Sequence, residues 1–198
     1  VTFTEKAALE MEERVDKLLD FGYMDLWIST FHAFCERVLR ENALDIGLPT
    51  DFKILDNTSG WLLARQNLDK FNLNYYKSLG NPTKFIQALI SHFSHCKDQE
   101  IYPKDYLNYA DTLKTRDDAP DESLEVERIK EVANAYHAYQ QILLENSALD
   151  FGDLINYCLK LFKERPLILK KYREKFKYIL VDEFQDTNWS QYELIKLL

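Results

Sequence analysis

Two adjacent carboxylates, Asp182 and Glu183, are the side chains best suited to chemistry in this chain. They follow an apolar run, residues 178–181, that predicts a short buried strand. Ligands of open parallel α/β sheets bind at the carboxyl ends of strands, where neighbouring residues point to opposite faces. One acid can therefore hold a hydrated Mg²⁺ while the other deprotonates an attacking water. The alternative is that the acids only separate a strand from a helix, whose N-cap would be Asp186, Thr187 or Asn188.

Two other junctions between an expected strand and an expected helix carry side chains that suit a nucleic acid. Phe3 and Thr4 end the first strand, and an aromatic ring there can stack on any base, at roughly 1–3 kcal/mol per base. Thr30 and His32 flank the start of the second helix, where a hydroxyl, an imidazole and free helix N–H groups suit a phosphate oxygen. Each has a structural alternative, with Phe3 in the core, Thr4 as a helix cap and His32 as an ordinary structural residue.

Two further groups precede or occupy expected helices. Asp150 is a good N-cap for the helix that follows it, and Phe151 is suited to anchor that helix. His92, His95 and Cys96 share one face of another expected helix. Because a zinc site usually needs a fourth ligand, and none stands at an obvious spacing, we do not expect a metal there.

Short strands followed by helices must position these side chains. The apolar patterns predict strands at residues 1–4, 26–30 and 178–182. Helices are predicted at residues 5–20, with Gly22 as the stop, at residues 31–42, and from about residue 189. Such units of strand and helix indicate a parallel sheet covered by helices.

The middle of the chain has a different pattern. Residues 57–146 contain no convincing strand but four helical stretches, which are Thr58–Phe71, Pro82–Lys97, Pro103–Leu113 and Ser123–Glu145. The sequence therefore predicts an α/β fold, predominantly helical overall, in which a large all-α insert interrupts a core with few parallel strands. The expected boundaries are residues 1–50 and 148–198 for the core and 51–147 for the insert.

Several strings resemble, in order and spacing, the motif series of superfamily 1 DNA helicases of the UvrD/Rep/PcrA type. They are VTFTEKAALEMEERV (1–15), WISTFHAFCERVLR (27–40), DFKILD (51–56), ALDFGDLI (148–155) and KYREKFKYILVDEFQDTNWSQ (171–191). The resemblance covers essentially the whole chain. It implies a partial RecA-like P-loop motor domain that hydrolyses Mg²⁺–ATP, moves 3′ to 5′ along single-stranded DNA and meets duplex junctions.

The same resemblance implies roles for individual residues. Asp182 would coordinate Mg²⁺ through water, and Glu183 would lie beside the metal as the catalytic base. Gln185 would sense the γ-phosphate of ATP, so that all three side chains face the phosphates. The side chains implied to line the DNA path are Phe3, Thr4, Thr30, His32 and Phe151.

The phosphate-binding loop of that family, G-x-x-x-x-G-K-[ST], does not occur in these 198 residues. We expect it upstream of Val1, and the family's second motor domain is also missing. The chain is therefore interpreted as a fragment that lacks ATPase activity when isolated. Two alternatives stay open: the motor part of an AddA/RecB-type helicase–nuclease, and a non-catalytic DNA-binding or structural module.

Composition excludes some classes of protein and indicates a cellular compartment. The net charge of −8 is not the footprint of a strong stand-alone nucleic-acid binder, and no apolar run approaches the length of about 18 residues that spans a membrane. Cys35, Cys96 and Cys158 have no C-x-x-C spacing, which indicates free thiols in a reducing compartment, the cytoplasm. Residues 160–177 carry eight basic and two acidic residues, a cluster that a solvated helix face explains better than phosphate contact. The oligomeric state stays open, with a monomer as the simplest case.

Overall fold

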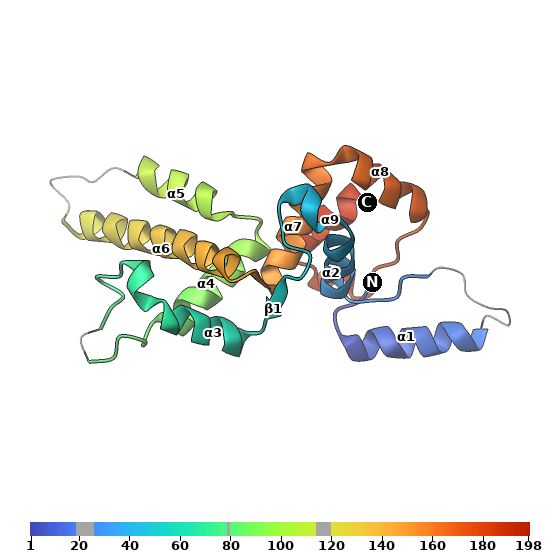
Figure 1. Ribbon diagram of the computed structural model, residues 1–198, viewed down its shortest axis with the longest axis horizontal. Coiled ribbons are helices and arrows are strands. Elements are labelled where there is room, and N and C mark those ends of the chain that lie inside the picture. The colour runs from blue at the N-terminus through green and yellow to red at the C-terminus, as the bar shows by residue number, and fades with distance from the viewer. Residues whose placement is uncertain (19–25, 79, 114–119) are drawn as a thin grey trace. The chain divides into compact units, whose positions relative to one another are not determined.

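The computed structural model describes residues 1–18, 26–78, 80–113 and 120–198, and the chain divides into two compact units (Figure 1). The core unit consists of residues 1–51 and 153–198, and the helical unit consists of residues 52–152. Both are predominantly helical, and the described residues contain one regular sheet, of two strands. None of the helices described is both long enough and apolar enough to cross a membrane.

The core unit contains α1 Glu5–Leu18, α2 Phe31–Asn42, most of α7 Phe151–Glu164, α8 Pro166–Lys175, α9 Trp189–Leu197, and the 3₁₀ turns η1 Ala43–Ile46 and η3 Phe184–Asp186. The helices predicted at residues 31–42 and from 189 are confirmed. The first predicted helix is confirmed as far as Leu18, and its expected stop at Gly22 lies outside the described residues. Of the three candidate caps for the last helix, Asn188 fills the role, because its Oδ1 accepts a 2.9 Å hydrogen bond from the Gln191 N–H.

Helices α2 and α7 supply much of the interior of the core unit, because each carries apolar side chains on one face. Their fully enclosed members include Cys35, Val38, Leu39, Cys158, Leu159, Leu161 and Phe162. Tyr172 of α8 packs against Phe162, with ring centroids 5.6 Å apart. The three helices thus share one core.

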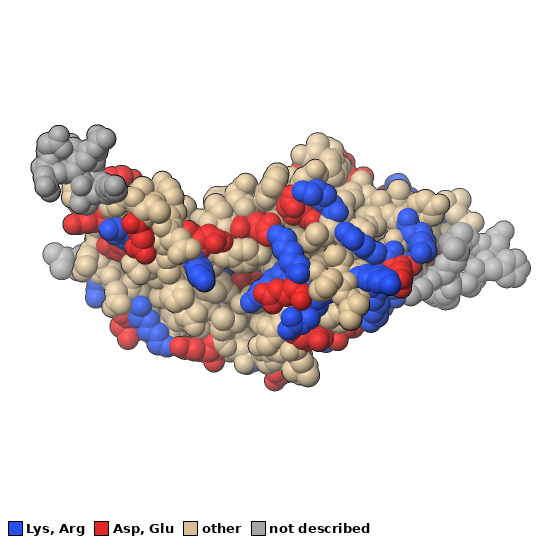
Figure 2. All heavy atoms as spheres, turned by 90° about the horizontal axis from the view of Figure 1, so that it is seen from above, with Lys and Arg blue, Asp and Glu red and all other residues tan. Residues whose placement is uncertain are grey.

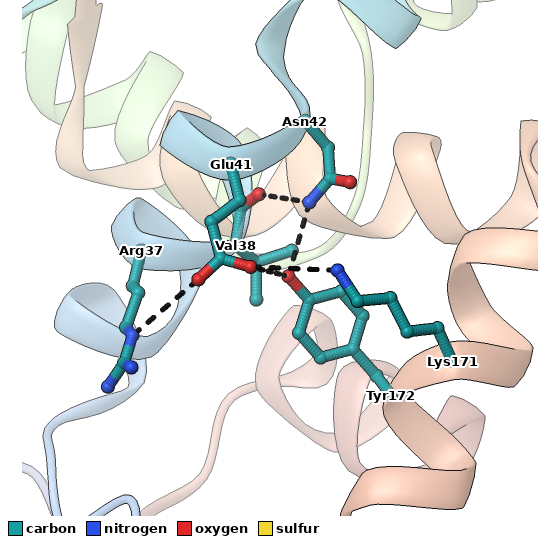
Figure 3. A network of polar contacts seen from close by, with 6 residues as sticks. All are labelled: Arg37, Val38, Glu41, Asn42, Lys171 and Tyr172. Atoms are coloured by element: carbon teal, nitrogen blue, oxygen red, sulfur yellow. Dashed lines mark hydrogen bonds and ion pairs between the residues drawn. The ribbon is translucent and has the colours of Figure 1, made fainter.

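A polar network joins α2 to α8 (Figure 3). Asn42 Nδ2 donates a 3.1 Å hydrogen bond to the Tyr172 hydroxyl, which donates one of 2.9 Å to Glu41 Oε2. Arg37 Nε lies 3.7 Å from Glu41 Oε1, and Lys171 Nζ lies 4.0 Å from Glu41 Oε2. Burial and the neighbouring Glu41 carboxylate raise the pKa of Tyr172, so the phenol stays protonated at neutral pH and keeps donating.

Three extended segments of the core unit lie side by side and run in parallel. The Thr2 N–H donates a 3.1 Å hydrogen bond to the Ser29 carbonyl, which pairs Thr2 with Thr30. On the other side, the Val1 nitrogen donates to the Leu180 carbonyl at 2.7 Å, and the Asp182 N–H donates to the Val1 carbonyl at 3.0 Å. The first segment is therefore the middle one of the three.

These segments are not regular strands, so the strands predicted at residues 1–4, 26–30 and 178–182 are wrong. The burial predicted for residues 178–181 is wrong as well, because Tyr178 is 90% and Leu180 is 82% exposed. Within the described part of the chain, each outer segment is paired on one side only, by one or two backbone bonds. An apolar run in a parallel sheet becomes buried only when helices or strands cover both of its faces.

The helical unit is built from α3 Asn57–Gln66, η2 Leu68–Phe71, α4 Ile86–Asp98, α5 Pro103–Thr112 and α6 Pro120–Glu145. These elements confirm the four predicted helical stretches, although α4 begins four residues after Pro82 because residues 82–85 form turns. In Figure 1, α6 runs between α5 on one side and α3 and α4 on the other. The rings of Phe93 and Tyr136 stack in the core of this unit, with centroids 4.9 Å apart.

A parallel sheet of two short strands lies where the chain enters and leaves the helical unit. Strand β1 Lys53–Leu55 pairs with β2 Ala148–Asp150, and Lys53 lies opposite Ala148. Neither strand was predicted, because three residues are too few to show an alternating pattern. The pairing holds the two ends of the unit together.

Candidate functional site

The parallel segments of the core unit bring residues of three separate motifs to one edge. Thr2 pairs with Thr30, and Val1 is bonded to both Leu180 and Asp182. Because the segments run in the same direction, the residues that follow each of them emerge at a common end. Those residues are Phe3 and Thr4, Phe31 and His32, and Glu183 and Phe184.

The acidic motif forms a tight turn. Glu183 has a left-handed backbone, with φ 48° and ψ 44°, which turns the chain into η3. A non-glycine residue in this conformation costs roughly 1–2 kcal/mol. The Asp186 N–H donates to the Glu183 carbonyl at 2.9 Å, and Gln185 Nε2 donates to Glu183 Oε2. The turn therefore holds Glu183 and Gln185 as a hydrogen-bonded pair, a contact that their spacing in the sequence did not predict.

The donor set of this turn fits a hydrated magnesium ion. Asp182, Glu183 and Gln185 are exposed, so a ligand can reach their polar atoms. Mg²⁺ usually keeps several waters and is held by one or two carboxylates together with phosphate oxygens. The described residues contain no cluster of three or more metal-binding side chains, so an all-protein cage does not fit them.

Thr30 and His32 mark the start of α2. Thr30 Oγ1 accepts a 3.2 Å hydrogen bond from the Ala33 N–H, so Thr30 is the N-cap of this helix. Its hydroxyl still has one O–H to donate. Burial lowers the pKa of His32 below its ordinary value of 6.5, so the imidazole is neutral at pH 7. It can donate an N–H to a phosphate oxygen but brings no positive charge of its own.

Phe3 and Thr4 combine structural contacts with partial exposure. The Phe3 ring packs against the buried ring of Phe31, with centroids 5.5 Å apart, and stays partly exposed. Thr4 Oγ1 accepts a 3.1 Å hydrogen bond from the Ala7 N–H, so the predicted alternative of a helix cap is confirmed for Thr4. Packing fixes one side of the Phe3 ring and leaves part of it accessible.

Phe151 belongs to the helical unit, where it begins α7 and is 47% exposed. Its neighbour Asp150, predicted as a helix cap, ends β2, and Asp150 Oδ2 accepts a 2.7 Å hydrogen bond from Lys97 Nζ. Lys97 was missed in the sequence, although it left a signal. It continues the apolar stripe of α4 that includes Ile90 and Phe93, and a lysine at such a position needs a carboxylate partner.

The face of α4 that carries His92 and Cys96 is held by local contacts. His92 Nε2 lies 3.0 Å from the Tyr106 hydroxyl and 3.7 Å from Cys96 Sγ. Burial raises the pKa of the Cys96 thiol to about 11, and burial together with His95 lowers the pKa of His92. The thiol is therefore protonated at neutral pH, which suits a structural contact.

The basic cluster at residues 160–177 is interleaved with carboxylates. Figure 2 shows Lys and Arg side chains gathered, with Asp and Glu among them, on the face of the core unit that carries α8. Lys170 Nζ lies 3.8 Å from Glu174 Oε1, and Lys171 Nζ lies 4.0 Å from Glu41 Oε2. Such exposed ion pairs contribute about 0–1 kcal/mol each. They are typical of the solvated face predicted for this cluster.

Known proteins are similar to this chain over its full length. Residues 1–198 match the UvrD/REP helicase N-terminal domain. The ATP-dependent DNA helicase PcrA of Staphylococcus aureus is 40% identical over 198 residues, which is 100% of this chain and 24% of that protein. The proteins of the same name from Bacillus subtilis and Staphylococcus epidermidis are each 38% identical over 198 residues. The chain thus spans about a quarter of the length of these relatives.

Proposed function

The chain belongs to the UvrD/REP helicase family, and from this premise we propose that it is part of a motor that couples Mg²⁺–ATP hydrolysis to 3′-to-5′ movement along single-stranded DNA. The observation that carries the proposal is the backbone pairing of Thr2 with Thr30 and of Val1 with the segment that ends at Asp182. This pairing supports a direct mechanical link between the acidic turn and the two junctions suited to DNA. A change at one can shift the others through two or three backbone bonds.

The core unit is proposed to be part of a RecA-like P-loop domain. Its three parallel extended segments are each followed by a helix or turn, which is the order expected for a doubly wound α/β sheet. The helical unit is then the all-α insert of that domain. The boundaries predicted from the sequence, at residues 50/51 and 147/148, are proposed as the limits of the insert.

In the proposed ATP site, Asp182 would help to hold the hydrated metal ion, and Glu183 would accept the proton of the attacking water. When bound, Mg²⁺ neutralises negative charge on the β- and γ-phosphates of ATP. Gln185 is hydrogen-bonded to Glu183 and is proposed to orient the same water. Glu183 and Gln185 belong to one turn. A shift of this turn on loss of the γ-phosphate would therefore reach Val1 through the hydrogen bond from the Asp182 N–H to the Val1 carbonyl.

In the proposed DNA path, Phe3 stacks on a base, and Thr30 and His32 donate hydrogen bonds to phosphate oxygens. Thr4 lines the path beside Phe3. Phe151 of the helical unit is proposed as an aromatic contact to single-stranded DNA in its own right. Stacking requires only the flat face of a base, so these contacts do not select a sequence. That property suits a motor that moves along single strands up to duplex junctions.

Glu183→Gln in the complete protein tests the proposal. The amide keeps the shape of the side chain and removes the base, so DNA-stimulated ATP hydrolysis should fall roughly 10²- to 10⁴-fold while ATP and DNA affinities stay within a few fold. Glu174→Gln, at an exposed ion pair on α8, is the matched control and should hydrolyse ATP normally. Hydrolysis at the wild-type rate in the Glu183→Gln protein would show that another group acts as the base.

A further inference from the structure

Lys97 of α4 is unusual for a lysine, because it is 1% exposed. Its ammonium donates a 2.7 Å hydrogen bond to Asp150 Oδ2 and lies 5.4 Å from the centroid of the Tyr139 ring. Taking an ammonium out of water costs several kcal/mol, and only close pairing with an opposite charge offsets this cost. The fold therefore keeps a costly side chain at this position.

The stem of Lys97 lies against Gly152. A Cβ atom placed on residue 152 would be 2.9 Å from both Cβ and Cδ of Lys97 and 3.4 Å from its Cγ. The two separations of 2.9 Å are shorter than carbon atoms tolerate, so residue 152 can carry no side chain while Lys97 keeps its place. Lys97 thus touches residue 150 with its charged end and residue 152 with its stem.

Phe151 stands between these two contacts. It is the first residue of α7 and follows the last residue of β2, and its side chain is 47% exposed. We propose that Lys97 is a positioning residue for Phe151. Its contacts with Asp150 and Gly152, the residues before and after Phe151, fix the ring in one orientation in which it can stack on a nucleic-acid base. The proposal rests on the proposed function in one respect, the contact between Phe151 and single-stranded DNA.

If Lys97 served only the packing of the helical unit, its loss would have different effects on stability and DNA binding. In that case, loss of Lys97 would weaken the helical unit, and any effect on DNA binding would be independent of the ring at position 151. In the proposed role, the effect of Lys97 on DNA binding passes through Phe151. Two experiments separate these cases, one with DNA and one without.

The first experiment measures the conformational heterogeneity of the ring at position 151 in the 198-residue chain, by ¹⁹F NMR with 4-fluorophenylalanine at that position. One narrow resonance is expected for the otherwise unchanged chain, and a broadened or split one for Lys97→Met. Asp150→Asn is the second variant, because it nearly keeps the shape of the pair and removes one charge. Lys70→Met removes an exposed 2.8 Å ion pair with Glu145 in the same unit and should leave the resonance unchanged. An unchanged resonance in both Lys97→Met and Asp150→Asn, with a retained circular dichroism spectrum, would overturn the proposal.

The second experiment is a double-mutant cycle in the complete protein, with a fluorescein-labelled oligothymidine titrated by anisotropy. Phe151→Ala should weaken binding on the order of 5- to 150-fold, the range for loss of one stacked base. Lys97→Met should weaken binding by a smaller factor in the wild-type background and by less than about 2-fold in the Phe151→Ala background.

Equal factors for Lys97→Met in the two backgrounds would show that Lys97 acts independently of the ring, and would overturn the proposal. Wild-type affinity in the Phe151→Ala protein would instead remove the DNA contact assigned to Phe151. The ¹⁹F comparison would then still decide whether Lys97 fixes the ring. The failure of the DNA contact and the failure of the positioning role are therefore distinguishable.

Discussion

Gly152→Ala is expected to destabilise the helical unit, although alanine usually stabilises a helix relative to glycine. Residue 152 is the second residue of α7, where alanine would contribute up to about 1 kcal/mol. The added methyl group would, however, lie 2.9 Å from Cβ and Cδ of Lys97. That Cβ is attached to the backbone of α4 and the side chain is 1% exposed, so it cannot swing aside. Overpacking of this kind costs about 1–3 kcal/mol, and we expect a net loss of about 1–2 kcal/mol.

Urea denaturation followed by circular dichroism measures this difference in the free energy of unfolding. Gly80→Ala is the matched control: among the described residues, no atom other than those of its chain neighbours lies within 4 Å of the added Cβ, and stability should stay within about 0.5 kcal/mol of the wild type. Lys97→Ala should reduce the extra cost of the methyl group when combined with Gly152→Ala, because Cγ and Cδ are removed, but the contact with Cβ at 2.9 Å should keep part of that cost. A Gly152→Ala protein at least as stable as the wild type would refute the close packing of Lys97 on residue 152.

Three further outcomes follow from the core unit. Thr30→Val should lower the free energy of unfolding by about 1 kcal/mol in urea denaturation, because the capping hydroxyl is lost at nearly constant shape, whereas Thr30→Ser should retain it. His32 has a lowered pKa, so its contribution to stability is fully present above its ordinary value of 6.5 and is lost as the pH falls through 6.5 toward the lowered pKa. The decline in melting temperature on acidification should therefore be smaller in His32→Gln than in the wild type and unchanged in His137→Gln, at an exposed site. Calorimetry of the 198-residue chain should detect no micromolar Mg²⁺–ATP binding, because carboxylates without a phosphate loop face the triphosphate charge unaided; micromolar binding would contradict this.

Helices were predicted well where local signals agreed. The bounds of α2 follow from Thr30, which caps the helix, and from the apolar spacing of Phe34, Val38 and Leu39. Likewise, α9 begins at Trp189 because Asn188 and Gln191 form reciprocal hydrogen bonds across its first turn. Such signals lie within one or two turns, so a single sequence contains them.

The features that were wrong or missed depend on partners distant in the sequence. Whether Tyr178 and Leu180 are buried is decided by what covers them, and their own apolar character does not determine it. The partner of Lys53 in β1 is Ala148, and the partner of Lys97 is Asp150. At the acidic motif, the residue types support the proposed chemistry, but the left-handed turn at Glu183 could not be predicted, because no glycine marks it.

The pairing of β1 with β2 also bears on the order in which this chain can fold. The core unit is made of two stretches, residues 1–51 and 153–198, with the whole helical unit between them. Bringing together the ends of a flexible loop of about 100 residues costs about 4 kcal/mol in chain entropy. Once the helical unit has formed, its strands hold Lys53 opposite Ala148, so the two stretches start as near neighbours. We therefore expect the helical unit to fold first, and a mutation that slows its folding should delay the core unit as well.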